Sequence, residues 1–251
     1  MRIIARLDVK NEWVIKGIQM EGLRKVGEPV DLAQAYYEAG VHEIIFMDAV
    51  ASLYDRNTLF HIIEAACENV FIPIVIGGGL RSLEDVANAL AAGADKVAIN
   101  TAAVNNLSLV SHVADRFGSQ CIVGSVEAKR QGDGSWQAYV DNGREPTGLN
   151  VLEWVRELEA AGVGEILLTS VDQDGTRRGF DLELFSAVNA ITSRPLILSG
   201  GYGAAEHMKA LSTCGGLPGA IAVGSVLHYN QTTPAELIAA ADTLETAALA
   251  A

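Results

Sequence analysis

The stretch EAGVHEIIFMD, residues 38–48, returns 122 positions later as AAGVGEILLTS, residues 160–170. A second stretch, IPIVIGGG at 72–79, returns with the same spacing as RPLILSGG at 194–201. Two separate segments that share one spacing indicate an internal repeat. The chain is therefore predicted to contain two similar halves.

Each half reads as four buried strands that alternate with helices. The strand candidates are short runs rich in Ile, Val and Leu, as expected for strands covered on both faces; they are residues 2–9, 43–48, 72–77, 95–100, 121–127, 165–170, 194–199 and 219–224. Helices are predicted between them, for example over 82–93, capped by Ser82, and over 148–162. Eight such units predict a single α/β domain, a (β/α)8 TIM barrel built from half-barrel repeats of about 1–119 and 120–251.

Net charge, the length of apolar runs and the cysteine count limit the kinds of partner and environment that we expect. The net charge of −13 disfavours nucleic acid, which needs a basic binding surface. No apolar run is long enough for a membrane span and no signal peptide is visible, so we expect a cytoplasmic protein without membrane contact. Three scattered cysteines argue against a disulfide framework. No spacing suggests a metal site, and we expect neither a metal nor a cofactor.

The repeat also places two carboxylates opposite each other. ARLDVK (5–10) and GSVEAK (124–129) each end an apolar run with an acid, a small or aliphatic residue and a lysine. In this fold the active site lies at the C-terminal ends of the strands. Asp8 and Glu127 are therefore predicted to face each other there as a general acid–base pair. Alternatively, each carboxylate pairs with a neighbouring lysine.

Glycine clusters predict two phosphate sites on opposite sides of the same opening. IGGGLRS (76–82) and LSGGYGA (198–204) follow strand candidates, and glycines let backbone N–H groups approach an anion. The candidate residues are Gly78, Gly79, Asn100 and Thr101 in the first half, and Ser199, Gly200, Gly201, Gly224 and Ser225 in the second. Two such sites imply a long small-molecule substrate with a phosphate at each end.

Two loops complete the prediction. DQDGTRRG (172–179) offers Asp172 and Asp174, which could stabilise their own loop or bind a metal, but which we expect to contact substrate hydroxyls and to cap a helix. Gly175 and Thr176 of the same loop are further candidates for binding the substrate. Residues 129–146 are the longest irregular stretch and are predicted to form a hairpin over the barrel opening, turning at 132–134.

The chain resembles the cyclase subunit family of imidazole glycerol phosphate synthase, an enzyme of histidine biosynthesis. The resemblance runs from Arg2 to about Tyr229 and rests on RIIARLDVK, VIKG, VGEPV, FIPIVIGGG, GADKVAINTAAV, FGSQCIV, GEILLTSVDQDGT, GFDLEL and SGG. It implies a reaction in which ammonia adds to a bisphosphate, phosphoribulosyl-formimino-aminoimidazole-carboxamide ribotide. Lysis and ring closure then give imidazole glycerol phosphate and the aminoimidazole carboxamide ribotide.

The resemblance also assigns residues. It implies that Asp8 and Glu127 are catalytic and that Lys16, in VIKG, engages the substrate from a mobile loop. One phosphate is assigned to Asn100 and Thr101. The glycerol-phosphate end is assigned to Asp174, Gly175, Gly201, Gly224 and Ser225.

An ammonia entrance is implied at the opposite, N-terminal face of the barrel. There the family carries a charged ring, matched here by Arg2, Glu43, Lys96 and Glu165, at or near the starts of four strand candidates. No cysteine of this chain has a nucleophile-elbow context for glutamine cleavage. A separate glutaminase subunit bound at this face is therefore expected.

The sequence departs from the family at several positions. Glu127 replaces the usual Asp, and Arg6 stands where Cys is usual. Arg6 shares its strand face with Asp8, so it should point into the barrel and needs a partner, for which Glu127 or Asp48 are expected. Further departures, expected to cluster around the chemistry, are Ala49-Val50, Tyr202 and GGLPG at 215–219.

These departures leave alternatives open. The chain could be a paralogue that delivers glutaminase-derived ammonia to another substrate, such as an activated sugar in surface-polysaccharide synthesis. A barrel that has lost catalysis and acts as an interaction partner is a third class. The isomerase of the same pathway shares the half-barrel plan, but DKVAINTAAV, FGSQCIV and VIKG favour the cyclase.

Overall fold

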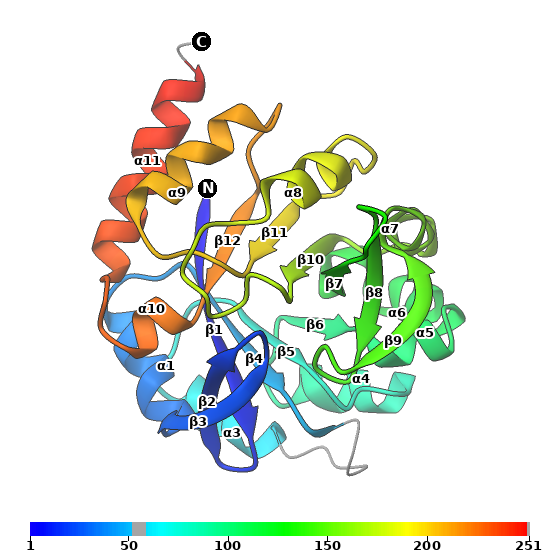
Figure 1. Ribbon diagram of the computed structural model, residues 1–251. Coiled ribbons are helices and arrows are strands. Elements are labelled where there is room, and N and C mark those ends of the chain that lie inside the picture. The colour runs from blue at the N-terminus through cyan, green and yellow to red at the C-terminus, as the bar shows by residue number, and fades with distance from the viewer. Residues whose placement is uncertain (52–58, 250–251) are drawn as a thin grey trace.

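Eight parallel strands close into a ring in the computed structural model, which describes residues 1–51 and 59–249 (Figure 1). Around the ring they are β1 (Arg2–Lys10), β4 (Glu43–Asp48), β5 (Ile74–Gly77), β6 (Lys96–Ile99), β7 (Ile122–Arg130), β10 (Glu165–Ser170), β11 (Leu196–Ser199) and β12 (Ala220–Val223). Pairing of β10 with β7 and of β12 with β1 completes the ring. The predicted (β/α)8 barrel is confirmed. All eight predicted strands are present, with ends that differ by no more than three residues.

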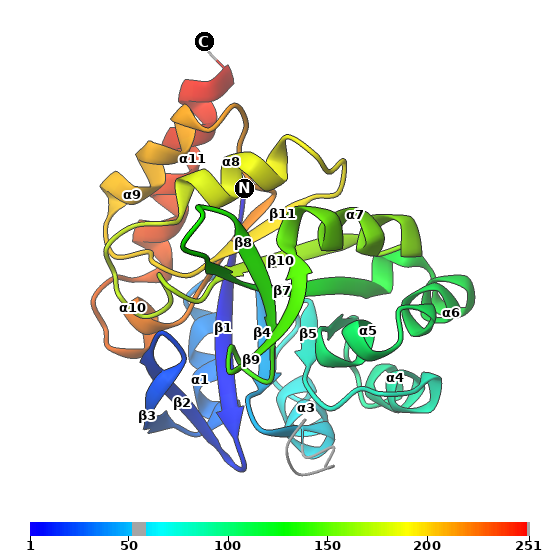
Figure 2. The ribbon, with the colours of Figure 1, turned by 45° about the vertical axis from the view of Figure 1, so that its right-hand side comes forward.

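Helices lie outside the strands and cover the barrel (Figure 2). They are α1 (Pro29–Glu38), α3 (Phe60–Cys67), α4 (Leu83–Ala91), α5 (Thr101–Asn105), α6 (Ser108–Phe117), α7 (Val151–Ala161), α8 (Leu182–Asn189), α9 (Ala205–Ala210), α10 (Ser225–His228) and α11 (Pro234–Leu249), with 3₁₀ turns at Ser119–Cys121 and Leu211–Thr213. The predicted cap of α4 is confirmed, because the Ser82 hydroxyl accepts from the Asp85 N–H in a capping box. The helix predicted to start at 148 begins at Val151, since the preceding residues form a strand.

Each of the strands β1 and β7 continues into an antiparallel hairpin. One hairpin is β2 (Trp13–Ile18) with β3 (Glu21–Gly27), and the other is β8 (Trp136–Val140) with β9 (Glu145–Asn150). The turn predicted at 132–134 is confirmed, because Gln131 N–H donates to the Ser135 carbonyl at 2.8 Å and β8 pairs back onto β7. The first hairpin and β9 were not predicted from the sequence.

Side chains alternate along the strands between two separate apolar layers. Ile3 and Leu7 of β1 pack toward the helices in the larger core, whereas Ile4 belongs to a smaller cluster inside the barrel. This period of two is the pattern expected for a strand buried on both faces. It places Arg6 and Asp8 on the lumen side, above Ile4.

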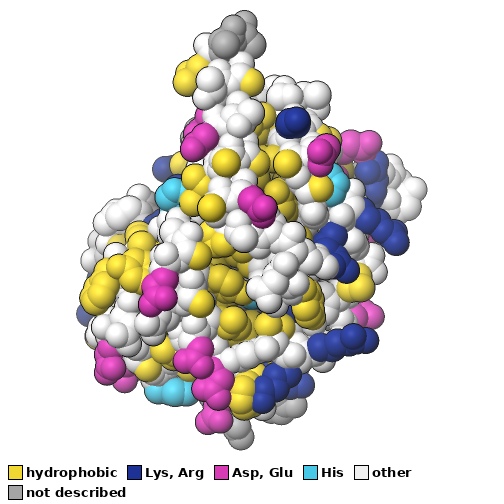
Figure 3. All heavy atoms as spheres, turned by 90° about the vertical axis from the view of Figure 1, so that its left-hand side faces the viewer, with side chains coloured by type: hydrophobic (Ala, Val, Ile, Leu, Met, Phe, Trp, Pro, Cys, Tyr) yellow, Lys and Arg dark blue, Asp and Glu magenta, His cyan; other side chains and the backbone are white. Residues whose placement is uncertain are grey.

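The charges on the outer surface are unevenly spread. On the face seen in Figure 3, Asp and Glu side chains lie at several separate places, whereas Lys and Arg gather along one edge. Within the described residues, no helix is long and apolar enough to cross a membrane.

A buried histidine ties three elements together beneath the opening of the barrel. His228 of α10 lies 2.7 Å from the Tyr36 hydroxyl of α1 and 3.1 Å from the carbonyl oxygen of Arg6 in β1. A carbonyl only accepts, so Nε2 carries the proton and Nδ1 accepts from Tyr36. Burial, assisted by the positive charge of Lys16, lowers the pKa of His228 to about 4.

This burial predicts a pH-dependent stability. Between pH 6.5, the ordinary pKa of histidine, and about 4, the unfolded chain binds a proton at His228 that the folded chain excludes. Stability should fall as pH falls through this window, with a contribution from His228 of up to about 1.4 kcal/mol per pH unit. Urea unfolding of His228→Phe should lack this contribution. The exposed His61→Phe variant is the control and should keep the wild-type slope. Equal slopes in wild type and His228→Phe would contradict the assignment.

Candidate active site

Asp8 and Glu127 lie on opposite strands of the ring. Three strands separate β1 from β7 in either direction, so the two carboxylates approach the barrel opening from opposite sides. Both are buried, with 6% and 4% of their surface exposed. The structure therefore brings the predicted pair to the same end of the barrel, but it gives the two members different surroundings.

Asp8 is held by two cations. Its Oδ1 accepts from Arg6 Nε at 2.8 Å, and its Oδ2 accepts from Lys16 Nζ at 2.8 Å. Burial opposes ionisation of Asp8, but Arg6 and Lys16 outweigh it and hold the pKa of Asp8 well below its usual range. Asp8 is consequently a carboxylate at any physiological pH. Asp8 thus pairs with a lysine, as the alternative expects, but this lysine is Lys16 of β2 and not Lys10.

Lys16 links the two halves of the site. Its ammonium group also donates to both carboxylate oxygens of Asp174, at 3.0 and 2.9 Å. Asp174 follows β10, whereas Lys16 reaches it from β2. The hairpin is fixed further by Gln19 N–H, which donates to the Asp174 carbonyl at 2.7 Å. Lys16 and Asp174 were both predicted to contact the substrate, and in this structure they bond to each other.

The expected partners of Arg6 need correction. Arg6 bonds to Asp8 rather than to Glu127 or Asp48, because residues two apart on one strand share a face and lie close together. Its Nη1 reaches across the lumen and donates to the Thr169 hydroxyl at 2.9 Å and to the Ser199 hydroxyl at 3.3 Å.

Among the described residues, Glu127 receives a single hydrogen bond, and its donor is neutral. Its Oε2 accepts from the Gly143 N–H at 2.7 Å, in the turn between β8 and β9. Gly143 and the two residues before it, Asp141 and Asn142, all have positive φ, so this tight turn aims a backbone N–H inward. Burial raises the pKa of Glu127 to about 7, although Arg6 and the Gly143 N–H oppose it. Glu127 therefore exchanges a proton near neutrality, as a general acid–base group must.

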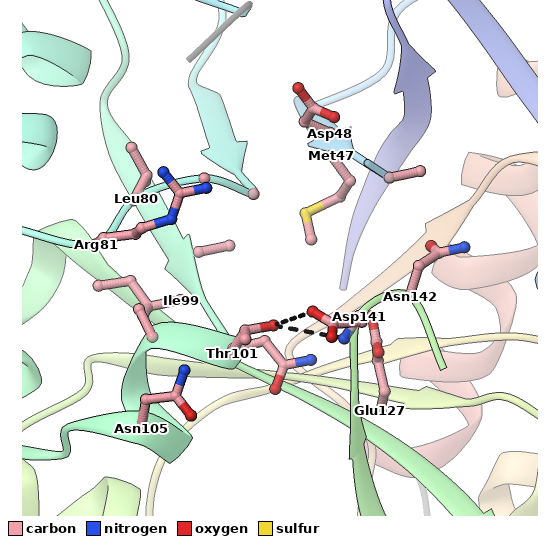
Figure 4. A pocket seen from close by; sticks show the side chains of 16 residues that line it. Met47, Asp48, Leu80, Arg81, Ile99, Thr101, Asn105, Glu127, Asp141 and Asn142 are labelled. Atoms are coloured by element: carbon pink, nitrogen blue, oxygen red, sulfur yellow. Dashed lines mark hydrogen bonds between the residues drawn. The ribbon is translucent and has the colours of Figure 1, made fainter. Parts of the chain in front are cut away.

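The first-half candidates line one pocket. Gly78, Gly79, Asn100 and Thr101 surround a cavity of about 150 Å³ that also contains Glu127. Figure 4 shows Thr101 hydrogen-bonded to Asp141, with Glu127 beside them and Asp48 on another wall. Arg81 supplies a cation to the same pocket. Ala49, one of the departures from the family, lies in its lining as expected.

The second-half candidates line a smaller pocket. Ser199, Gly200, Gly201, Gly224 and Ser225 surround about 20 Å³, together with Arg6, Lys16, Asp174, Gly175 and Tyr202. The two pockets lie on opposite sides of the opening, one after β5 and β6 and one after β11 and β12. The repeat predicts two similar pockets, but their volumes differ, and the smaller one is lined by the long side chains of Arg6 and Lys16.

The glycines after β5 and β11 have a packing reason as well. A Cβ on Gly78 would lie 2.5 Å from the Asp48 carbonyl oxygen, and one on Gly201 would lie 1.9 Å from that of Gly179. Gly175 likewise allows close contact with the Gly17 carbonyl, where the β2–β3 hairpin crosses. Thr176 donates its hydroxyl to the Gln173 carbonyl at 2.8 Å, within its own loop.

The four residues of the charged ring meet at the N-terminal ends of their strands. Arg2 pairs with Glu43 and Glu165, and Lys96 Nζ lies 3.0 Å from Glu43 and 2.8 Å from Glu165. The ring alternates two cations with two carboxylates. The apolar cluster inside the barrel separates it from the site above.

One departure lies away from the chemistry. The segment 215–219 precedes β12, and the Gly219 carbonyl accepts from Arg2 N–H at 3.1 Å, at the charged-ring end. The expectation that it neighbours the active site is therefore wrong. Its place follows from the parallel barrel, in which every connection into a strand lies opposite the site.

Sequence reasoning missed the parts of both hairpins that enter the site. Gly143 and Asp141 were not predicted, nor was the contact of Asn100 with the Tyr139 carbonyl at 3.1 Å. A signal was present, since Trp13 and Trp136 begin the two hairpins 123 residues apart. Among the described residues, no group of three or more His, Cys, Asp or Glu side chains is arranged to hold a metal ion.

Fold and site together define a (β/α)8-barrel protein with two opposed carboxylates between two glycine-containing pockets. Residues 2–233 match the family of histidine biosynthesis proteins. The imidazole glycerol phosphate synthase subunit HisF of Legionella pneumophila is 57% identical over 209 residues, 83% of this chain and 99% of that protein. HisF of Myxococcus xanthus is 48% identical over 232 residues, 92% of this chain and 91% of that protein. HisF of Streptococcus sanguinis is 47% identical over 235 residues, 94% and 93% of the two chains. The chain belongs to the histidine biosynthesis family, as a member of its HisF group.

Glu127 is buried, and no cation donates a hydrogen bond to it among the described residues, which predicts that its charge destabilises the fold. Its folded-state pKa of about 7 lies above the ordinary value of 4.5, so the stabilising protonated form is lost as pH rises through 7. Glu127→Gln keeps an acceptor for Gly143 and carries no charge. We expect it to be more stable than wild type at pH 8.5 by about 2–3 kcal/mol, and nearly equal at pH 4.5. Urea unfolding at both pH values measures this, with the exposed Glu153→Gln as control. A variant less stable at pH 8.5 would contradict the environment described.

Proposed function

We propose that this chain is the cyclase subunit of imidazole glycerol phosphate synthase, a lyase. It would use ammonia from a glutaminase partner to convert phosphoribulosyl-formimino-aminoimidazole-carboxamide ribotide into imidazole glycerol phosphate and the aminoimidazole carboxamide ribotide. The observation that carries the proposal is a pair of carboxylates between two pockets, in a chain 45–57% identical to proteins named HisF. The half-barrel repeat and the cytoplasmic location expected from the sequence stay predictions.

The pockets support a bisphosphate substrate. Backbone N–H groups beside Gly78 and Gly79 and the Thr101 hydroxyl are suited to one phosphate, and Arg81 adds a charge. The second pocket would take the glycerol-phosphate end at Gly201, after Lys16 exchanges Asp174 for the substrate. Asp8 and Glu127 would then flank the carbon and nitrogen atoms that react.

The N-terminal face supports the partner. The charged ring surrounds the lower end of the lumen, where ammonia would enter. Close to it, Phe71 precedes β5 and is 74% exposed, resting edge-on against Tyr37 at a ring-centroid distance of 6.1 Å. An exposed aromatic side chain beside a rim of charges is typical of an interface centre. The glutaminase subunit would cover this face.

The reaction is tested with purified protein, the bisphosphate and an ammonium salt. We expect imidazole glycerol phosphate to form, and Asp8→Asn to lower kcat/KM by at least about 100-fold, as loss of a fixed charge that stabilises the transition state does. Asp115→Asn, on the exposed face of α6, is the control. Product formation is followed by chromatography. Binding of the bisphosphate without turnover would sink the cyclase proposal and favour a paralogue that passes ammonia to another acceptor.

The partner face is tested by a single charge. Phe71→Asp should weaken binding of the glutaminase subunit by at least about 10-fold, because it places a charge in the centre of the interface. The matched control is Tyr229→Asp, which lies beyond α10 at the opposite end of the barrel and is 44% exposed. Titration calorimetry measures both. Equal weakening by the two variants, or by neither, would contradict a partner seated at this face.

A further inference from the structure

Arg6 is a buried arginine in the lumen that hydrogen-bonds to one of the two carboxylates, Asp8. Arg6 is 2% exposed and lies between the apolar cluster below and Asp8 above. Burial alone would lower the pKa of its guanidinium, but Asp8 and Asp174 raise it, so Arg6 stays charged. Its hydrogen bonds to Asp8, Thr169 and Ser199 join β1 to β10 and β11.

The two carboxylates differ in what their oxygens contact. Both oxygens of Asp8 accept from cations, one from Arg6 and one from Lys16. Within residues 1–51 and 59–249, Glu127 accepts only from the neutral Gly143 N–H. The two carboxylates therefore lie on opposite strands and differ in how strongly they bind a proton.

We propose that Arg6 is a positioning residue that keeps Asp8 a fixed carboxylate and so leaves Glu127, on the opposite strand, as the group that carries the exchangeable proton. The catalytic role of this proton rests on the proposed cyclase function. The different charge environments of Asp8 and Glu127 do not depend on that function. The role goes beyond the duplicated-carboxylate pattern, which treats the two acids as equivalent.

Arg6, rather than Lys16, is suited to this role. Lys16 lies on the β2–β3 hairpin and divides its ammonium group between Asp8 and Asp174. Arg6 lies on a barrel strand, and its backbone carbonyl is fixed by His228 Nε2 at 3.1 Å. If the hairpin opens to admit substrate, Asp8 loses Lys16 but keeps Arg6.

The other charged groups around Asp8 do not reverse this assignment. Asp174 is neutralised by Lys16, and His228 is held uncharged by burial, with a pKa of about 4. The other nearby acid, Asp48, is the last residue of β4, where it pairs with Val9 rather than with Asp8, and its Oδ1 accepts from the Val50 N–H at 2.9 Å.

Around Glu127, the acids outnumber the bases. Asp8 faces it across the opening and Asp141 approaches from the β8–β9 turn; both raise its pKa, which burial raises first, to about 7. Arg6 opposes them through space without a hydrogen bond to Glu127. Asp48 and Arg81 line the same pocket and contribute one charge of each sign.

The proton then has a balanced route. As the bond from carbon to the leaving aminoimidazole nitrogen breaks, neutral Glu127 gives its proton to that nitrogen. As the nitrogen derived from ammonia bonds to carbon, it returns a proton to the Glu127 carboxylate. Asp8 keeps its charge throughout and stabilises positive charge that develops on the nitrogen.

Direct titration tests the assignment without any substrate. Carboxyl ¹³C signals of labelled Asp and Glu, assigned with Asp8→Asn and Glu127→Gln, should show Glu127 titrating near neutrality and Asp8 not titrating down to pH 4. In Arg6→Gln the protonated fraction of Asp8 at pH 4 should rise at least about tenfold, because the fixed cation is gone. Arg6→Lys should restore the wild-type behaviour in part. Thr169→Val, which removes a contact of Arg6 but no charge, should leave Asp8 unchanged.

Two results would overturn the proposal. One is an Asp8 signal that titrates alike in wild type, Arg6→Gln and Arg6→Lys. The other is a wild-type Glu127 that is fully ionised at pH 5.5. If Arg6→Gln does not fold, the wild-type titration and Arg6→Lys decide the matter. A failed cyclase assay beside the expected titrations would reject the proposed function alone.

Discussion

An eight-stranded barrel leaves no room in its lumen for an unpaired charge, and this constraint organises the whole molecule. Water is excluded there, so an isolated ion would cost several kcal/mol. The lumen accordingly contains two layers of charged side chains, and in each layer the positive and negative charges balance. The charged ring at the N-terminal end joins two cations to two carboxylates, and the upper layer joins Arg6 and Lys16 to Asp8 and Asp174. Between them lies the apolar cluster. Glu127 is the acid left outside both layers, and its raised pKa is the consequence.

Each of the two hairpins contacts the other predicted half of the barrel. The hairpin after β1 sends Lys16 to Asp174, and the hairpin after β7 brings Asp141 to Thr101. In each case a segment from one predicted half contacts a loop of the other. The reason is the strand order, because β1 pairs with β12 and β7 pairs with β6. Each hairpin therefore covers the pocket beside the strand that precedes its own in the ring, and neither pocket is complete within one half.

The eight strands could be predicted because burial on both faces leaves a continuous apolar run, as in EIIFMD at 43–48. The opposed positions of Asp8 and Glu127 could be predicted because the repeat fixes which strands are four places apart in the ring. The β2–β3 hairpin was missed because β3 is exposed and has the polar composition of a loop. The contacts of Arg6 with Thr169 and Ser199 depend on side-chain reach across a closed lumen, which a linear pattern does not contain.

The sequence by itself determined the barrel, the repeat spacing, the end of the barrel where chemistry gathers and the residue types available there. These follow from local rules, since periodicity and glycine position act over a few residues and strand order follows from chain order. Only the tertiary structure decided how the charges are shared. A carboxylate acquires its proton affinity from the cations, dipoles and solvent within a few ångströms, and those neighbours come from distant segments. Asp8 and Glu127 look equivalent in the sequence, and folding makes one a permanent anion and the other a proton carrier.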